Sequence, residues 1–238
     1  MSIAIVLFSG GLDSTACVYW SIDRYEKVIL LSLLYWSKED EVIEKANQKY
    51  RSLLSLEGKV IAIPFLGEFT KFAGSKLSKR EKEPPSFSNF SELDQKAITN
   101  EAAKQVWVPG RNILLLSIAA SFADSMKEPV DIIFGANLEE GETFPDNTKE
   151  FVDKMNESLT LGCMNKVRIQ APFHDLLKSD IVKYLEKKGA NLEFSSSCYN
   201  VEDWTNDGKP IHCGKCESCL RRKRAFSNAE ISDKTLYK

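Results

Sequence analysis

The sequence predicts an α/β protein with a parallel five-stranded sheet, helices on both faces of the sheet, and a small C-terminal zinc module. Two observations support this fold class. Five short apolar runs alternate with longer segments of helical periodicity, and four of the six cysteines lie between residues 198 and 219. Strands that alternate with helices along the chain pair in parallel, because each helical crossover packs back onto the sheet. Such a sheet is covered on both faces.

The expected strands cover residues 3–8, 28–35, 60–63, 129–135 and 167–171, and the expected helices cover residues 14–24, 38–56, 112–126, 147–161 and 179–188. These elements place an α/β domain in residues 1–193 and the zinc module in residues 194–238. Residues 71–100 interrupt the alternation with a charged run, Pro84-Pro85 and a polar stretch. A long irregular segment inside a domain predicts a lid or a disordered insert.

Composition narrows the class of protein. A chain of 238 residues, of which 43% are hydrophobic, is long enough to bury a substantial core. The formal net charge of -2 lacks the basic excess that phosphate binding usually requires, so a nucleic-acid partner is not expected. The N-terminal apolar run has no basic leader, and no apolar run reaches membrane-spanning length. We therefore expect a cytoplasmic protein without a membrane partner.

The first strand is followed by Ser9-Gly10-Gly11-Leu12-Asp13-Ser14 at the start of a helix. Glycines let the backbone approach a ligand closely, and the first N–H groups of a helix lack intrahelical partners. The loop is therefore suited to a phosphate chain, with hydroxyl donors from Ser9, Ser14 and Thr15. Asp13 would be unfavourable beside a bare polyphosphate but can help to hold the divalent cation of ATP. The alternative is a tight turn in which Asp13 or Ser14 caps the helix.

Cys198, Cys213, Cys216 and Cys219 form a second motif, with C-x-x-C spacing twice. Four thiolates suit a tetrahedral structural zinc ion, because the C-x-x-C turn directs both sulfur atoms inward. An iron–sulfur cluster or a redox pair would use the same residues. His212 is adjacent and could replace one ligand, but four cysteines suffice.

The glycine loop resembles the signature of the PP-loop ATP pyrophosphatases, which have an adenine nucleotide α-hydrolase-like, Rossmann-like fold. The cysteine segment, with Arg222, Ala225 and Phe226 after it, is similar to the zinc segment of the 7-cyano-7-deazaguanine synthase family. The family's V-P-G-R-N segment is matched by Val108-Pro109-Gly110-Arg111-Asn112. Weaker matches are Phe144-Pro145-Asp146 and Ala171-Pro172-Phe173 with Lys178 downstream, and all follow the order of the family along nearly the whole chain. The resemblance therefore covers the glycine loop, the middle of the chain and the cysteine segment.

The resemblance implies an adenylate-forming carbon–nitrogen ligase. Such an enzyme uses ATP, releasing AMP and pyrophosphate, to activate the carboxylate of 7-carboxy-7-deazaguanine for attack by ammonia, and it forms the nitrile through the amide. It implies ATP, Mg²⁺ and Zn²⁺ as cofactors, and we expect a homodimer. The implied catalytic residues are Asp13, Arg111 and Lys178, and the implied substrate contacts are Tyr35, Phe144 and Asp146. The implied nucleotide contacts are Phe8, Ser9, Gly10, Gly11, Leu12, Asp13, Ser14, Thr15, Leu34, Gly110 and Arg111.

Several of these residues also have a structural interpretation. Arg111 could pair with a nearby acid, Asn112 could cap the next helix, Asp146 could be a helix N-cap, and Lys178 could be solvated at a helix start. The acidic residues Glu139, Glu140 and Glu142 follow a strand end, where they could bind a metal or form a solvated loop.

The chain also departs from the family. The family's D-Y-G-Q-R-H becomes Leu34-Tyr35-Trp36-Ser37-Lys38-Glu39, and its Y-P-D-C-R ends here in Asn147-Thr148. These changes leave open a paralogue that transfers the activated base to another amine, such as one on a polypeptide. A tRNA-thiolating enzyme, which needs a reactive cysteine such as Cys163, is a second alternative. The third is a zinc-ribbon nucleic-acid binder using residues 221–224, although that run is more simply a solvated helix end.

Overall fold

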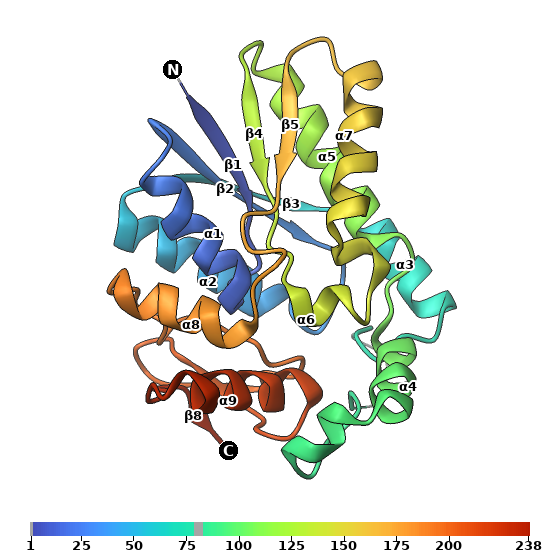
Figure 1. Cartoon of the computed structure of the whole chain (residues 1–238), viewed down its shortest axis with the longest axis vertical. Helices are drawn as coiled ribbons and strands as arrows, with labels where there is room; N and C mark the ends of the chain where they lie inside the picture. The colour runs from blue at the N-terminus through green and yellow to red at the C-terminus, as the bar shows by residue number, and fades with distance from the viewer. Residues whose placement is uncertain (1, 79–82) are drawn as a thin grey trace.

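A computed structural model describes residues 2–78 and 83–238. Its main sheet confirms the predicted class: five parallel strands lie in the order β3-β2-β1-β4-β5. Their bounds are β1 Ile3–Leu7, β2 Lys27–Leu34, β3 Glu57–Ala62, β4 Val130–Ile133 and β5 Val167–Gln170. Figure 1 shows the sheet with helices on both sides. The expected strands are all present, but β3 begins three residues earlier than residue 60.

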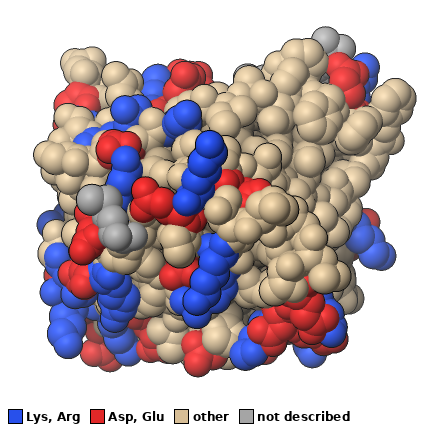
Figure 2. Space-filling view, turned by 90° about the horizontal axis from the view of Figure 1, so that it is seen from above, with Lys and Arg blue, Asp and Glu red and all other residues tan. Residues whose placement is uncertain are grey.

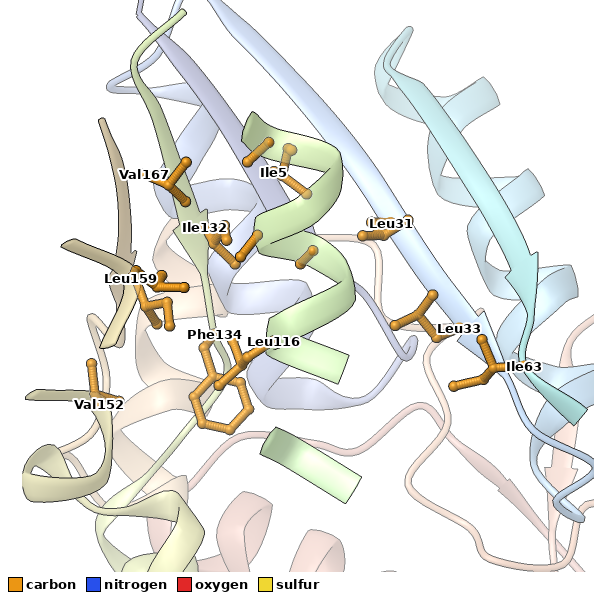
Figure 3. Packing of buried hydrophobic residues seen from close by; sticks show 14 of the residues in the cluster. Ile5, Leu31, Leu33, Ile63, Leu116, Ile132, Phe134, Val152, Leu159 and Val167 are labelled. Carbon is orange, nitrogen blue, oxygen red and sulfur yellow. The ribbon is translucent and has the colours of Figure 1, made fainter. Parts of the chain in front are cut away.

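Successive side chains of β1 point to opposite faces of the sheet, so they contribute to two separate hydrophobic cores. Ile3 and Ile5 pack with Leu31 and Ile132 on one face of the sheet, beneath α5 (Arg111–Ser125) and α7 (Lys149–Gly162). Figure 3 shows this core, which is continuous across the sheet. On the other face, Ala4 and Val6 pack under α1 (Leu12–Ile22), α2 (Asp40–Leu54) and α8 (Lys178–Lys187).

The strand order fixes where a ligand can bind. From β1 the chain proceeds outward to β2 and β3, and it then returns to the other side of β1 to form β4. The crevice at the carboxyl ends of β1 and β4 is therefore a topological switch point, which is where open α/β sheets bind their ligands. The glycine loop follows β1 at this crevice, and α6 (Leu138–Gly141) and η2 (Pro145–Asn147) follow β4.

The C-terminal residues form more secondary structure than the sequence suggested. A three-stranded sheet contains β6 (Asp203–Trp204), β7 (Pro210–His212) and β8 (Leu236–Tyr237), and α9 (Glu217–Ala229) packs against α8. Figure 1 shows this region across the carboxyl ends of the main strands. Ala225 and Phe226 of α9 are buried in the same core as Val6. The division at residue 193 stays a prediction, but the two parts share a core.

The segment expected as a lid or a disordered insert contains regular structure. Besides α3 (Pro64–Phe72), the chain forms η1 (Phe90–Asp94) and α4 (Lys96–Val106). Phe87 and Leu93 pack with Leu220 of α9, and the Phe87 N–H donates to the carbonyl of Lys215. Residues 83–100 therefore contain regular secondary structure, whereas residues 79–82 lie outside the described part, and the disordered insert stays a prediction. Movement as a lid stays a prediction.

The surface charge is mixed on the face that Figure 2 shows. On the face seen in Figure 2, Lys and Arg side chains are interspersed with Asp and Glu. This face offers no continuous basic surface of the kind that a nucleic-acid backbone requires. No single helix within residues 2–78 and 83–238 is long and apolar enough to cross a membrane. Helices α4 and α5 reach that length and apolar composition only when taken together, and a bend of 51° separates them.

Candidate active site

The glycine loop is held in one conformation by backbone geometry and hydroxyl contacts. Gly10 has φ +79, and a Cβ at this position would lie 2.6 Å from the Cβ of Ala46. The Ser14 hydroxyl accepts from the Ser9 N–H at 3.3 Å and donates to the Gly11 carbonyl at 3.2 Å. Gly11 is the N-cap of α1 and makes no side-chain cap hydrogen bond, so neither Asp13 nor Ser14 is the cap residue of this helix. The first turn of α1 is thus suited to an anion.

A cavity opens in front of this loop. Its walls come from the glycine loop, the start of α2, the segment before α5, the turn after β4, the start of α8, and α9 with the residues before the cysteines. The predicted site residues that line it are Phe8, Ser9, Gly11, Leu12, Asp13, Ser14, Tyr35, Arg111, Phe144, Asp146 and Lys178.

Four of the predicted nucleotide contacts lie outside the lining. Gly10 is covered by Ala46, and Thr15 is fully buried inside α1. Leu34 ends β2, and Gly110 forms the left-handed turn before α5 with φ +60. These residues can shape the site, but direct nucleotide contact by them stays a prediction.

Lys178 lies at the centre of a buried charge cluster. Its Nζ is 2.5 Å from Glu140 Oε1 and 3.5 Å from Asp13 Oδ2, and its side chain is only 7% exposed. Burial alone would lower the pKa of Lys178, but the two carboxylates outweigh burial and raise it. Lys178 begins α8 as expected, but the interpretations of Lys178 as a solvated residue and of Glu140 as part of a solvated loop are wrong.

Asp13 and Glu140 both lie beside Lys178, but the pKa values of their carboxyl groups shift in opposite directions. Burial and the neighbouring Glu140 raise the pKa of Asp13 to about 6, although Lys178 opposes the rise. Burial also opposes ionisation of Glu140, but Lys178 overcomes it and lowers the pKa of Glu140 to about 2. Asp13 Oδ1 is buried without a hydrogen-bond partner among the described residues. An uncompensated carboxylate oxygen beside a phosphate-type loop fits a divalent cation such as Mg²⁺.

Arg111 defines the other side of the cavity. The acids around it and the Tyr35 hydroxyl raise the pKa of Arg111 against the effect of burial. Burial has the opposite effect on the two acidic groups beside it: it is the main cause that raises the pKa of Tyr35 to about 12 and the pKa of Glu39 to about 7. The interpretation that Arg111 interacts with acids is therefore supported, and it is compatible with ligand binding, because Arg111 also lines the cavity.

Asn112 and Asp146 do not cap helices as the alternatives suggested. Helix α5 begins at Arg111 with Gly110 as N-cap, so Asn112 lies inside the helix and donates to the carbonyl of Asp146 at 3.4 Å. The cap of α7 is Thr148, which accepts from the Phe151 N–H at 3.2 Å. Asp146 is thus available to the cavity, and burial raises its pKa.

Several residues that line the cavity were not predicted from the sequence as site residues. The ring of Trp107 stacks with that of Phe144, with centroids 6.0 Å apart and an angle of 14° between planes. Glu39 lines the cavity within the segment that departs from the family. Glu217 and Arg221 reach the cavity from α9, and the guanidinium donates to Glu217 Oε1 at 2.8 and 2.9 Å. The i, i+4 spacing of this pair was the available signal.

The basic run in α9 is not a solvated helix end. The side chains of Arg221 and Arg222 are 10% and 0% exposed, respectively, and both have acidic partners. Arg224 also bonds to Asp94 of η1 at 2.8 Å. The run therefore joins the C-terminal region to the rest of the chain.

The four predicted cysteines come together in one cluster. Their sulfur atoms lie within 4.8 Å of one another, and Cys213 Sγ is 3.9 Å from Cys219 Sγ. Zinc–sulfur bonds of ~2.3 Å in a tetrahedron require sulfur separations of ~3.8 Å. The N–H groups of Asn200 and Cys213 each donate to Cys198 Sγ at 3.3 Å, as suits a thiolate. The cluster can bind a metal such as zinc, and His212 is not part of it.

A parallel sheet whose first strand ends in a glycine loop, with a charged cavity at its topological switch point, defines an ATP-using enzyme of the PP-loop class. Residues 3–230 match the family described as "Queuosine biosynthesis protein QueC". The chain belongs to this family.

The relatives agree with this assignment. The chain is 48% identical to the 7-cyano-7-deazaguanine synthase of Pyrococcus horikoshii, over 100% of this chain and 98% of that protein. It is 42% identical to the 7-cyano-7-deazaguanine synthase of Methanocaldococcus jannaschii, over 98% of each chain. Among solved structures, the U34-tRNA thiolase NcsA from Methanococcus maripaludis matches with a TM-score of 0.46 at 15% identity, over 96% of this chain and 67% of that one. This structural likeness is too low to support a functional conclusion.

Proposed function

We propose that the protein adenylates the carboxylate of 7-carboxy-7-deazaguanine with ATP and releases pyrophosphate, after which ammonia attacks the activated carbon, displaces AMP and gives the amide. A second ATP then adenylates the amide oxygen with release of pyrophosphate, and loss of that oxygen in AMP gives the nitrile. The observation that carries this proposal is the glycine loop at the start of α1, whose Asp13 lies 3.5 Å from Lys178 at the switch point of the sheet. A carboxylate resists attack by an amine until one oxygen becomes a leaving group, and adenylation supplies that group.

The residues of the cavity have separable roles in this proposal. The amides of the glycine loop and Lys178 bind the leaving pyrophosphate, on which negative charge builds. Arg111, with its forked guanidinium, binds the α-phosphate or the substrate carboxylate. A preorganised donor of this kind typically contributes ~3 kcal/mol to transition-state stability. When bound at Asp13, Mg²⁺ supplies positive charge to the phosphates.

The deazaguanine base has a suitable surface on the opposite wall. The stacked rings of Trp107 and Phe144 offer a flat apolar face for a planar heterocycle. The Asp146 carboxylate accepts from its N–H groups, and the Tyr35 hydroxyl donates to its carbonyl oxygen. Zinc at the four cysteines has a structural role, because four thiolates leave no open coordination position.

Product analysis tests the proposal. The protein is incubated with ATP, Mg²⁺ and 7-carboxy-7-deazaguanine, with and without ammonium, and the products are identified by mass spectrometry. We expect AMP and pyrophosphate, with amide and nitrile only when ammonium is present. Formation of ADP and orthophosphate instead would refute adenylation.

One observation favours an amine other than ammonia as the acceptor of the activated base. Glu39, which lines the cavity, stands where the family pattern has histidine. A paralogue that transfers the activated base to another amine would release AMP slowly with ammonium and would stop at the amide when an amine-bearing polypeptide is supplied. The nitrile yield with ammonium alone distinguishes the two candidates.

A further inference from the structure

Arg222 is a buried arginine outside the cavity, within the segment that follows the cysteine cluster. Its side chain is 0% exposed. Its Nε lies 3.3 Å from Asp233 Oδ2 near the C-terminus, and its Nη1 donates to Ser195 Oγ at 3.0 Å and to Ser197 Oγ at 3.5 Å. A buried guanidinium is costly unless such partners are fixed around it. Arg222 therefore ties α9 to the segment that precedes Cys198.

That segment rests directly on the glycine loop. The Ser196 N–H donates to the Gly10 carbonyl at 2.8 Å. A Cβ added to Gly11 would meet the Ser196 carbonyl at 3.6 Å, which is ordinary van der Waals contact. Ser196 and Ser197 also line the cavity. This backbone therefore lies against both glycines of the loop.

The geometry of the guanidinium explains why arginine suits this place. Its planar fork offers donors on two sides at once, so one side chain can hold Asp233 and the two serine hydroxyls. The serines on either side of Ser196 are held by the same nitrogen, which fixes the direction of the Ser196 N–H between them. Gly10 has a left-handed φ and, in the described residues, receives this hydrogen bond from outside its own loop.

We propose that Arg222 is a positioning residue for the nucleotide, which acts through Ser195, Ser197 and the Ser196 N–H to hold the glycine loop in its phosphate-binding conformation. The inference rests on the proposed binding of ATP at that loop. It gives the C-terminal region a role in nucleotide affinity in addition to metal binding.

The test measures the dissociation constant of ATP–Mg²⁺ by calorimetry, without the second substrate, on protein of equal metal content. We expect Arg222→Lys to weaken binding about tenfold, because an ammonium cannot reach Asp233 and both serines together. We expect Ser195→Ala to weaken binding about threefold and the double variant to be no weaker than Arg222→Lys alone. Such non-additivity reports one shared interaction.

Tyr237→Phe is the matched control. It removes a hydrogen bond to the same Asp233, at 2.7 Å, but does not touch residues 195–197. We expect it to lower the melting temperature while ATP affinity is unchanged. In steady-state assays, Arg222→Lys should raise the KM for ATP and leave the KM for 7-carboxy-7-deazaguanine unchanged.

The outcomes separate the inference from the proposed function. If wild-type protein binds ATP and both Arg222→Lys and Ser195→Ala bind it equally well, the inference is refuted, whatever their melting temperatures. If wild-type protein binds no ATP, the proposed function itself fails. Ser195→Ala leaves Arg222 paired with Asp233, so the test stands even where Arg222→Lys folds poorly.

Discussion

Replacement of Lys178 by methionine tests the charge cluster directly. The variant leaves Asp13 and Glu140 facing each other without the cation that both contact. Loss of one partner from a buried ion pair typically costs ~3–5 kcal/mol. Because the Glu140 side chain is 28% exposed and water can solvate part of it, we expect a loss at the lower end of this range. At ~2–4 °C per kcal/mol for a chain of this size, the melting temperature should fall by roughly 6–12 °C.

Thermal unfolding followed by circular dichroism at pH 7 measures this change. A second variant, Lys178→Met with Glu140→Gln, should recover part of the loss, because it removes the carboxylate that repels Asp13 once the lysine is absent. Lys154→Met, which removes an exposed pair with Glu157, is the control and should leave the melting temperature nearly unchanged. Our reasoning about the cluster is wrong if Lys178→Met unfolds at the same temperature as Lys154→Met, or if the double variant is no more stable than the single one. ATP turnover should also fall, by about 10²–10³-fold.

Three further predictions concern other parts of the molecule. Burial raises the pKa of Glu39 from 4.5 to about 7, so between these pH values the folded protein holds a proton that the unfolded chain releases. The free energy of unfolding should therefore decrease from pH 5 to pH 7, by up to ~1.4 kcal/mol per pH unit for one proton. Denaturant titrations should show a shallower decrease for Glu39→Gln, and an identical slope would contradict the assignment. Cys213→Ser should lose bound zinc in metal analysis and should unfold at a lower temperature than wild type; full zinc retention would exclude Cys213 as a ligand. Gly10→Ala should lower stability by ~1–2 kcal/mol and weaken ATP binding, because of its left-handed φ and the nearby Ala46, whereas Gly162→Ala, with open space around it, should do neither.

The sequence predicted the sheet well where strands are apolar and less well at its edge. The three central strands, β2, β1 and β4, are rich in apolar residues and mostly buried, so composition alone marks them. Strand β3 lies at an edge, and its first residues, Glu57-Gly58-Lys59, carry no apolar signal. Helix α4 was missed because its buried face consists mainly of small or polar residues, including Thr99, Ala102 and Ala103. Edge exposure and small side chains thus account for these errors.

The site was predictable where one local motif carries the chemistry. The glycine loop and the four cysteines each form a short pattern with a physical purpose, and both were recognised. Glu217 and Arg221 were not, because their position in the cavity wall depends on how α9 packs across the carboxyl ends of the strands. The pKa of Glu39 likewise depends on burial by distant segments. Long-range packing of this kind leaves no periodic signal in the chain.

The contact between Ser196 and Gly10 joins residues that leave the ribosome at very different times. Gly10 is among the first to emerge, whereas Ser196 follows after most of the chain has been synthesised. The turn after β1 therefore remains without this support through most of translation. A nascent chain that stops before residue 196 has the complete glycine motif but lacks this hydrogen bond, so the loop can reach its final conformation only after the segment that contains Ser196 has been made.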